Sequence, residues 1–244
     1  MELTFLGTGA AFAGDAHNAA YILDRRVLVD AGGPVHVLMR QSGHDLGDIE
    51  AVVISHQHGD HVFGLPFFMA TRAIERRQAP PLTIAAPPGF GDYISNLLRL
   101  SWGDRLHAIV WDALQPRFIE IEDSDSAEVA GFRLQGRRVI HVDDIPCLGF
   151  TLEKDGVRFG YSGDSGPCPG LDAIVAASRH VLVEMTTLDE SDPGHMSRAA
   201  IERMVQANPD KSFYLTHLNR RADSAPVAGA TFAEDLKTVE LTSA

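Results

Sequence analysis

The stretch that decides the fold runs from residue 51 to residue 61 and reads AVVISHQHGDH. Its first four residues form a continuous apolar run, which is typical of a strand buried on both faces. The residues that follow place three imidazoles and one carboxylate within a six-residue span. In a loop that turns back on itself, His56 and His58 can bind one cation, and Asp60 and His61 can reach a second. The stretch therefore predicts a metal centre at the end of a buried strand, and a solvated histidine-rich loop is the alternative.

Three more apolar runs end in a residue that can bind a metal ion. His141 follows one of these runs, Asp164 follows another, and His217 follows the last. Side chains at the ends of strands are held on rigid supports and face a common rim of the fold. We therefore expect these three residues to lie near the His56–His61 motif.

The rest of the chain alternates short apolar runs with Gly, Asp and Asn. This pattern predicts strands at 3–6, 20–23, 27–29, 51–54, 82–85, 117–121, 132–141, 148–153, 157–161, 181–184 and 212–216. It predicts helices at 35–41, 64–77, 90–100, 171–177, 197–207 and 232–237. Strand–helix alternation in each half indicates an α/β (α+β) fold, with two sheets between helices in a four-layer αββα sandwich. The sequence has no linker-like or low-complexity tract, so we expect residues 1–244 to form a single domain.

The composition of the chain limits the classes of molecule that it can bind. The 244 residues carry a formal charge of −12, which argues against a binder of long nucleic acids because such proteins have a basic footprint. This charge still permits a small anionic substrate, because bound cations can dominate the field in a site.

No apolar run is long enough for a membrane span. The start resembles a signal peptide only loosely, since it has Glu2 and lacks a basic region, so we expect a cytoplasmic protein. Cys147 and Cys168 match no metal spacing and are interpreted as buried or incidental thiols.

The pattern His56-x-His58-x-Asp60-His61 resembles the signature of the metallo-β-lactamase superfamily. The resemblance extends over nearly the whole chain and implies two divalent metal ions, most often zinc, with manganese or iron as alternatives. It implies that one ion is held by His56, His58 and His141, that the other is held by Asp60, His61 and His217, and that Asp164 bridges them. A hydroxide shared by two such ions is nucleophilic near neutral pH. Asp60 is also placed to orient this nucleophile or to accept its proton.

The segment Gly194-His195-Met196-Ser197 is similar to one in the ribonuclease Z-like and related phosphodiesterase branch of that superfamily. There a histidine assists phosphodiester cleavage by stabilising charge or by protonating the leaving group. The resemblance assigns this catalytic role to His195, and the alternative is a histidine that bonds local backbone at a helix start. We expect Glu184, at the end of a predicted strand, to orient His195.

The chain departs from the usual bacterial ribonuclease Z between His141 and Asp164. Predicted strands fill this interval and leave no room for the Gly/Pro-rich arm that those enzymes use on transfer RNA. The net negative charge also argues against binding of transfer RNA, so transfer RNA is a doubtful substrate. Three groups of arginines offer a grip on phosphate, although solvated surfaces are the expected interpretation; these are Arg72, Arg76 and Arg77, then Arg137 and Arg138, then Arg220 and Arg221.

These observations predict a dinuclear metal-dependent hydrolase that cleaves a small phosphodiester, such as a cyclic nucleotide, by a metal-bridging hydroxide. Hydrolysis of another ester, a thioester or a lactone is the first alternative. Ribonuclease Z-type processing of RNA 3′ ends and a non-catalytic metal-binding role are the others. We expect a small anionic substrate, no membrane and a homodimer, which is common in the family. We also expect Phe63, Phe67, Phe68 and Met69 to lie on a core-facing helix, with Phe63 or Phe67 as an alternative pocket lining.

Overall fold

A computed structural model describes residues 1–75, 80–219 and 225–243. The strands form two seven-stranded sheets, each with parallel and antiparallel pairs. In spatial order, the first sheet contains β14 (Lys237–Glu240), β1 (Glu2–Gly7), β2 (Ala20–Leu23), β3 (Val27–Val29), β4 (Ala51–Val53), β5 (Thr83–Ala86) and β6 (Arg117–Glu120). The second contains β13 (Ala230–Phe232), β12 (Ser212–Thr216), β11 (His180–Glu184), β10 (Val157–Tyr161), β9 (Leu148–Lys154), β8 (Phe132–Arg138) and β7 (Ser126–Val129).

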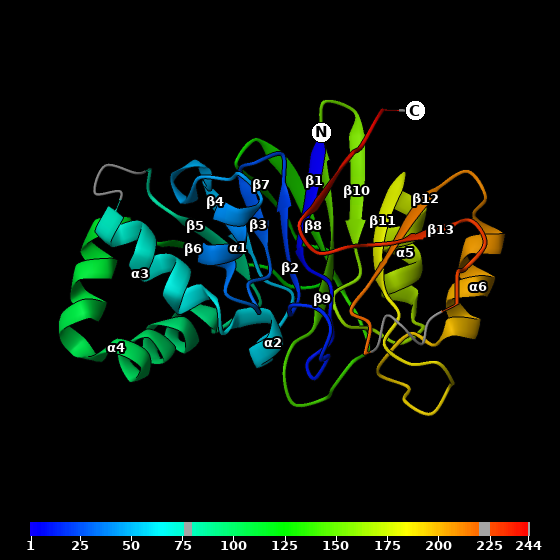
Figure 1. Cartoon of the computed structure of the whole chain (residues 1–244), viewed down its shortest axis with the longest axis horizontal. Coiled ribbons are helices and arrows are strands. Elements are labelled where there is room, and N and C mark those ends of the chain that lie inside the picture. The colour runs from blue at the N-terminus through cyan, green and yellow to red at the C-terminus, as the bar shows by residue number, and fades with distance from the viewer. Residues whose placement is uncertain (76–79, 220–224, 244) are drawn as a thin grey trace.

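Helices cover the outer face of each sheet, as Figure 1 shows. The helices on the first sheet are α1 (Val35–Gln41), α3 (Leu65–Glu75) and α4 (Phe90–Leu114), and those on the second are α5 (Pro169–Ala177) and α6 (Arg198–Ala207). The short elements η1 (Leu46–Asp48) and α2 (Gly59–Val62) join neighbouring segments. One apolar core lies between the two sheets and one under each helical layer. The predicted four-layer αββα sandwich is confirmed.

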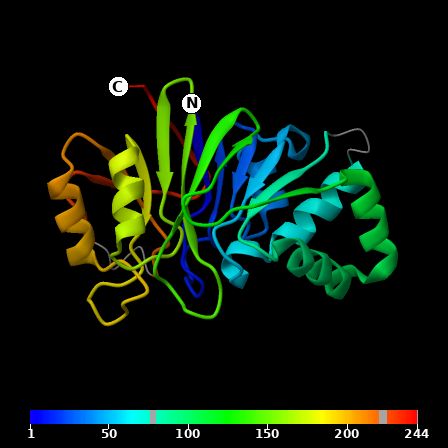
Figure 2. The ribbon, with the colours of Figure 1, turned by 180° about the vertical axis from the view of Figure 1, so that it is seen from behind.

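The strand directions bring several loops to one end of the molecule. Strands β3 to β6 run parallel, as do β10 to β13, so the carboxyl ends of the strands in each group share an edge. Figures 1 and 2 show the loops after β1, β8 and β11 gathered at the same end, close to α2. This end is where the predicted metal-binding residues lie. In the described ranges, no helix is both long enough and apolar enough to cross a bilayer.

The predicted final helix at 232–237 is wrong. The segment instead forms β13, a turn and β14, so that one short stretch adds an edge strand to each sheet. Strand β14 pairs antiparallel with β1, and the Leu241 amide donates to the Met1 carbonyl. Local sequence favoured a helix, but pairing with strands made by distant parts of the chain decides the outcome.

Two other predictions about the elements need correction. Helix α4 continues to Leu114, well past the predicted end at residue 100, across a kink at Gly103. Strand β7 was missed because it is mostly exposed and polar, with only Val129 buried.

Candidate metal centre

The proposed ligands stand at equivalent places on the fold. His56, His141 and Asp164 each come three residues after the end of a strand, namely β4, β8 and β10. His217 directly follows β12. The motif residues after His56 enter α2, whose first turn contains Asp60. The first sheet thus supplies one part of the cluster and the second sheet supplies the rest.

The first group is His56, His58 and His141, whose ligand atoms lie within 4.8 Å of one another. The Nε2 atom of His141 is 3.1 Å from Nδ1 of His58. The Nδ1–H of His141 donates to the Gly194 carbonyl at 3.1 Å, which leaves Nε2 as the free acceptor. His56 is fully buried, and its Nε2 has no hydrogen-bond partner. A buried imidazole nitrogen without a hydrogen-bond partner is available to bind a cation.

The second group is Asp60, His61, Asp164 and His217, again within 4.8 Å. Nε2 of His217 lies 3.1 Å from Asp60 Oδ2 and 3.3 Å from Asp164 Oδ2. Nε2 of His61 lies 3.4 Å from Asp60 Oδ2 and 3.3 Å from Asp164 Oδ1. Both this nitrogen and Asp164 Oδ1 are buried and lack a hydrogen-bond partner.

Asp164 lies between the two groups. Its Oδ2 is 3.8 Å from Nε2 of His141 and 4.0 Å from Nε2 of His56, while the same carboxylate contacts the second group. Burial alone would raise the pKa of Asp164, but the His217 and His61 imidazoles outweigh it and hold this pKa well below its usual value. Burial, reinforced by His61, lowers the pKa of His56. An ionised carboxylate and a neutral imidazole are the forms that bind a divalent cation.

Asp30, whose role the sequence analysis did not predict, holds residues of this centre and its surroundings by hydrogen bonds. Its carboxylate accepts from the Ser55 amide at 2.8 Å, from the Ser55 hydroxyl at 2.7 Å and from the Tyr161 hydroxyl at 2.7 Å. It also accepts from Nδ1–H of His61 at 2.8 Å, which turns Nε2 of that ring toward the cluster. The signal was present in the segment Leu28-Val29-Asp30-Ala31-Gly32, which takes part in the family resemblance but was given no role.

His195 lies beside the cluster. Its ring centre is 4.7 Å from that of His141 and 5.8 Å from that of His217. Its Nδ1 is 2.7 Å from Glu184 Oε1, which is the partner expected from the sequence. Burial lowers the pKa of His195, but the Glu184 carboxylate outweighs it and raises this pKa to about 9. The ring nitrogen Nδ1 is therefore held by Glu184 and not by local backbone.

The structure also bears on the predictions for the arginine groups and for the helix that follows the motif. Arg72 is fully buried and donates to the Pro80 carbonyl, so it belongs to no solvated surface. Arg137 and Arg138 lie at the end of β8, while Arg76, Arg77, Arg220 and Arg221 lie outside the described residues. Phe68 and Met69 are buried as predicted. Phe63 and Phe67 are 59% and 46% exposed, which corrects the prediction that they face the core.

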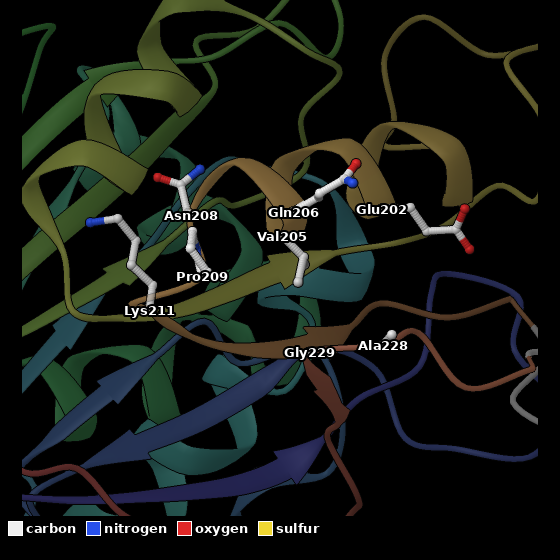
Figure 3. Close-up of a pocket in the computed structure, with 8 residues that line it drawn as sticks. All are labelled: Glu202, Val205, Gln206, Asn208, Pro209, Lys211, Ala228 and Gly229. Carbon is white, nitrogen blue, oxygen red and sulfur yellow. The ribbon is translucent and has the colours of Figure 1, made fainter.

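A surface pocket lies away from this centre, between the end of α6 and the start of β13 (Figure 3). It has a volume of about 600 Å³ and is lined by Glu202, Val205, Gln206, Asn208, Pro209, Lys211, Ala228 and Gly229. None of the eight belongs to the His/Asp cluster. The residues that could hold a metal ion therefore lie in the cluster and not in this pocket.

The two sheets have the fold of metallo-β-lactamase fold proteins, and part of the sequence is similar to ribonuclease Z. A sequence model of the family described as "Anti-Pycsar protein Apyc1" matches residues 1–234, and the chain belongs to this family.

Other similar proteins are found by sequence and by structure. Ribonuclease Z of Staphylococcus saprophyticus is 32% identical over 161 residues, which cover 63% of this chain and 49% of that protein. The chain thus spans about half the length of the curated relatives it matches. The crystal structure of human tRNase Z, short form, superposes with a TM-score of 0.75 at 24% identity, covering 99% of this chain and 100% of that one. YhfI from Bacillus subtilis, a metallo-β-lactamase fold protein, gives 0.76 at 16% identity and 98% of each chain. These two likenesses show the fold.

Proposed function

We propose that this protein is a dinuclear metal-dependent hydrolase that cleaves a small phosphodiester, such as a cyclic nucleotide. The observation that carries this proposal is the pairing of two His/Asp groups around Asp164, with a carboxylate-held His195 beside them. A binding protein needs no such added histidine, so this arrangement favours catalysis over metal storage or sensing.

The donor set fits two divalent cations. His56, His58 and His141 would hold one ion, and Asp60, His61 and His217 would hold the other, with Asp164 between them. The unpartnered buried atoms of His56, His61 and Asp164 support this assignment. Nitrogen and oxygen donors suit zinc, and also manganese or iron. When bound, the two ions supply Lewis acidity and generate a nucleophile from water at neutral pH.

Two side chains of the protein, Asp60 and His195, would carry out the proton transfers. Asp60 is placed to orient the attacking water or to accept its proton, because this side chain is partly exposed at the cluster. His195 keeps Nδ1 on Glu184, so Nε2 is the atom that can hand a proton to the leaving oxygen. Its position beside the His141 and His217 rings supports this role, because these two residues would hold different ions.

The short chain segment between His141 and Asp164 favours a small substrate over transfer RNA. A loop, strands β9 and β10 and the hairpin between them occupy the interval, with no arm to grip transfer RNA. The net charge of −12 also disfavours a long polyanion. Ribonuclease Z-type cleavage remains the second candidate, because relatives named ribonuclease Z share 31–33% identity with this chain.

A substrate panel tests the proposal. Protein loaded with zinc, manganese or iron is assayed on cyclic nucleotides, a chromogenic phosphodiester, a thioester, a lactone and a precursor transfer RNA. We expect turnover of the small phosphodiesters, with loss of about a hundredfold or more in kcat for His195→Ala. His107→Gln on α4, where the ring bonds Ser95, is the matched control and should retain activity. Turnover confined to the thioester, the lactone or the RNA would refute the small-phosphodiester assignment.

We also propose that residues 1–244 act as one domain, because both sheets contribute donors to the same cluster. A homodimer and a cytoplasmic location stay predictions from the sequence. Light scattering of the purified protein measures the mass of the assembly and so tests the dimer.

A further inference from the structure

Phe63 is an exposed aromatic ring next to the metal-binding motif. It directly follows α2, which lies at the end of the molecule where the loops gather (Figure 1). Its side chain is 59% exposed, whereas Leu65 and Phe68 in the next helix are fully buried. The proposed proton transfers, by Asp60 and His195, do not use this ring, so its exposure calls for a physical reason.

A close contact with Gly59 fixes where the ring lies. A Cβ built at Gly59 would be 2.4 Å from Cε2, 2.7 Å from Cζ and 2.8 Å from Cδ2 of Phe63. The ring therefore occupies the space that a side chain at position 59 would take. Gly59 lies between His58, a ligand candidate of the first group, and Asp60, a ligand candidate of the second. The ring thus stands beside the loop that connects the two groups.

The backbone around Phe63 is held in place before any substrate binds. The Phe63 amide donates to the Gly59 carbonyl at 2.9 Å, and the Gly64 amide donates to the Ala31 carbonyl at 2.7 Å. The Ala31 amide in turn donates to the carbonyl of His61 at 2.6 Å. A contact group that is already fixed in its binding position loses less conformational entropy when a ligand arrives.

An open aromatic ring beside two cation positions suits a ligand with two chemically different parts. The cations would bind an anionic group, and the ring offers a large apolar face to a flat group joined to that anion. Nucleic-acid bases stack on aromatic side chains whatever their hydrogen-bonding edge, because every base has a π face. A nucleotide combines both parts in one small molecule.

We propose that Phe63 determines specificity for nucleotides, because its ring stacks on the base while the phosphate lies at the metal centre. The placement of the phosphate rests on the proposed function. The stacking contact itself concerns binding, so it can be measured without turnover.

Phe67 provides the matched control, since it is the same residue type in the same part of the chain. It is 46% exposed, but its ring already has aromatic partners. It stacks on His36 with ring centres 5.5 Å apart, and it meets Trp102 edge to face at 5.0 Å. We therefore expect Phe67 to take no part in binding a base.

Calorimetric titration of zinc-loaded protein with adenosine 5′-monophosphate and with ribose 5-phosphate separates the base from the phosphate. Phe63→Leu, which is apolar but has no aromatic ring, should weaken binding of the nucleotide about tenfold and leave the affinity for ribose 5-phosphate unchanged. Phe63→Tyr keeps the ring and should bind both ligands as the wild type does. Phe67→Leu should also leave both affinities unchanged.

Fluorescence gives a second measurement, on the variant Phe63→Trp. Adenosine 5′-monophosphate should quench the added indole, and ribose 5-phosphate should not. The wild type supplies the background, because the chain has two tryptophans of its own, Trp102 and Trp111. The absence of base-dependent quenching would overturn the stacking role.

The remaining outcomes separate the stacking role from its competitors. Equal weakening of both ligands in Phe63→Leu would indicate a disturbed metal centre and overturn the proposal. Unchanged nucleotide affinity in Phe63→Leu, together with a changed assembly mass in light scattering, would assign the ring to a subunit interface instead. Wild-type protein that binds both ligands equally would refute the stacking role even if it hydrolyses small phosphodiesters. Base-dependent binding by protein that hydrolyses no phosphodiester would refute the proposed function and leave the stacking role standing.

Discussion

Asp30 shows how a single side chain can organise a centre that it does not enter. The carboxylate is fully buried and receives four hydrogen bonds, from His61, Tyr161 and both donors of Ser55. Its φ of +53° places it in the left-handed region, which aspartate tolerates better than most residues. A buried carboxylate with all its lone pairs engaged is stabilising only while every partner is present.

Asp30→Asn should therefore be costly, because an amide keeps one acceptor oxygen and puts an NH2 group where Oδ2 now accepts from the Ser55 hydroxyl, His61 and Tyr161. We expect the free energy of unfolding of the metal-free protein to fall by about 3 kcal/mol, measured by urea denaturation. Asp104→Asn is the control, since that side chain is 93% exposed and should leave the midpoint unchanged. Equal midpoints for Asp30→Asn and wild type would show that the network contributes nothing to stability.

Helix α4 illustrates what happens at the scale of an element. The periodicity of its first part predicts a helix, but the chain bends at Gly103 and continues helical to Leu114. Gly103 has φ 75° and ψ 169°, a combination open essentially to glycine alone. Nothing lies within 4 Å of a Cβ built at this position, so backbone conformation and not space requires the glycine.

Gly103→Ala should lower the free energy of unfolding by about 1–3 kcal/mol, the usual cost of such a strained backbone conformation. Gly91→Ala in the first turn of the same helix is the control. There a Cβ would make ordinary contact with the Phe118 ring at 3.4 Å, and alanine favours the helix over glycine by about 1 kcal/mol. We expect thermal melts to order the proteins as Gly91→Ala, wild type, Gly103→Ala. A Gly103→Ala protein as stable as the wild type would show that the kink is not imposed by this residue.

At the scale of the whole molecule, the centre ties the two sheets together. Strand β4 of the first sheet leads to His56 and Asp60, and strands β8, β10 and β12 of the second lead to His141, Asp164 and His217. Cations bound by this set would cross-link the two halves of the sandwich, because the unfolded chain does not hold these donors together.

Metal removal should therefore lower thermal stability. A ligand at a hundred times its Kd adds about 2.7 kcal/mol, which corresponds to about 5–10 °C in Tm for a chain of this size. We expect this difference between zinc-loaded and chelator-treated protein in a calorimetric scan. Asp164→Asn should reduce the difference, while His107→Gln should keep it. An identical Tm for protein shown by metal analysis to be loaded and for stripped protein would contradict the cross-linking role.

The sequence by itself determined the two-sheet architecture and the cluster of seven donors. It could do so because the donors follow apolar strands whose periodicity is local, and because four of them lie within six residues, His56 to His61. The resemblance of residues 194–197 to the ribonuclease Z-like branch pointed to His195, and the place of Glu184 at a predicted strand end pointed to its partner. These features depend on spacing along the chain, which a sequence displays directly.

Only the tertiary structure revealed Asp30 as a hub, the exposure of Phe63 and the conversion of the predicted last helix into β13 and β14. Each depends on partners distant in sequence: 131 residues separate Asp30 from Tyr161. The free energy of such contacts comes from burial and hydrogen bonding between segments that meet only in the folded chain, so no local pattern encodes them.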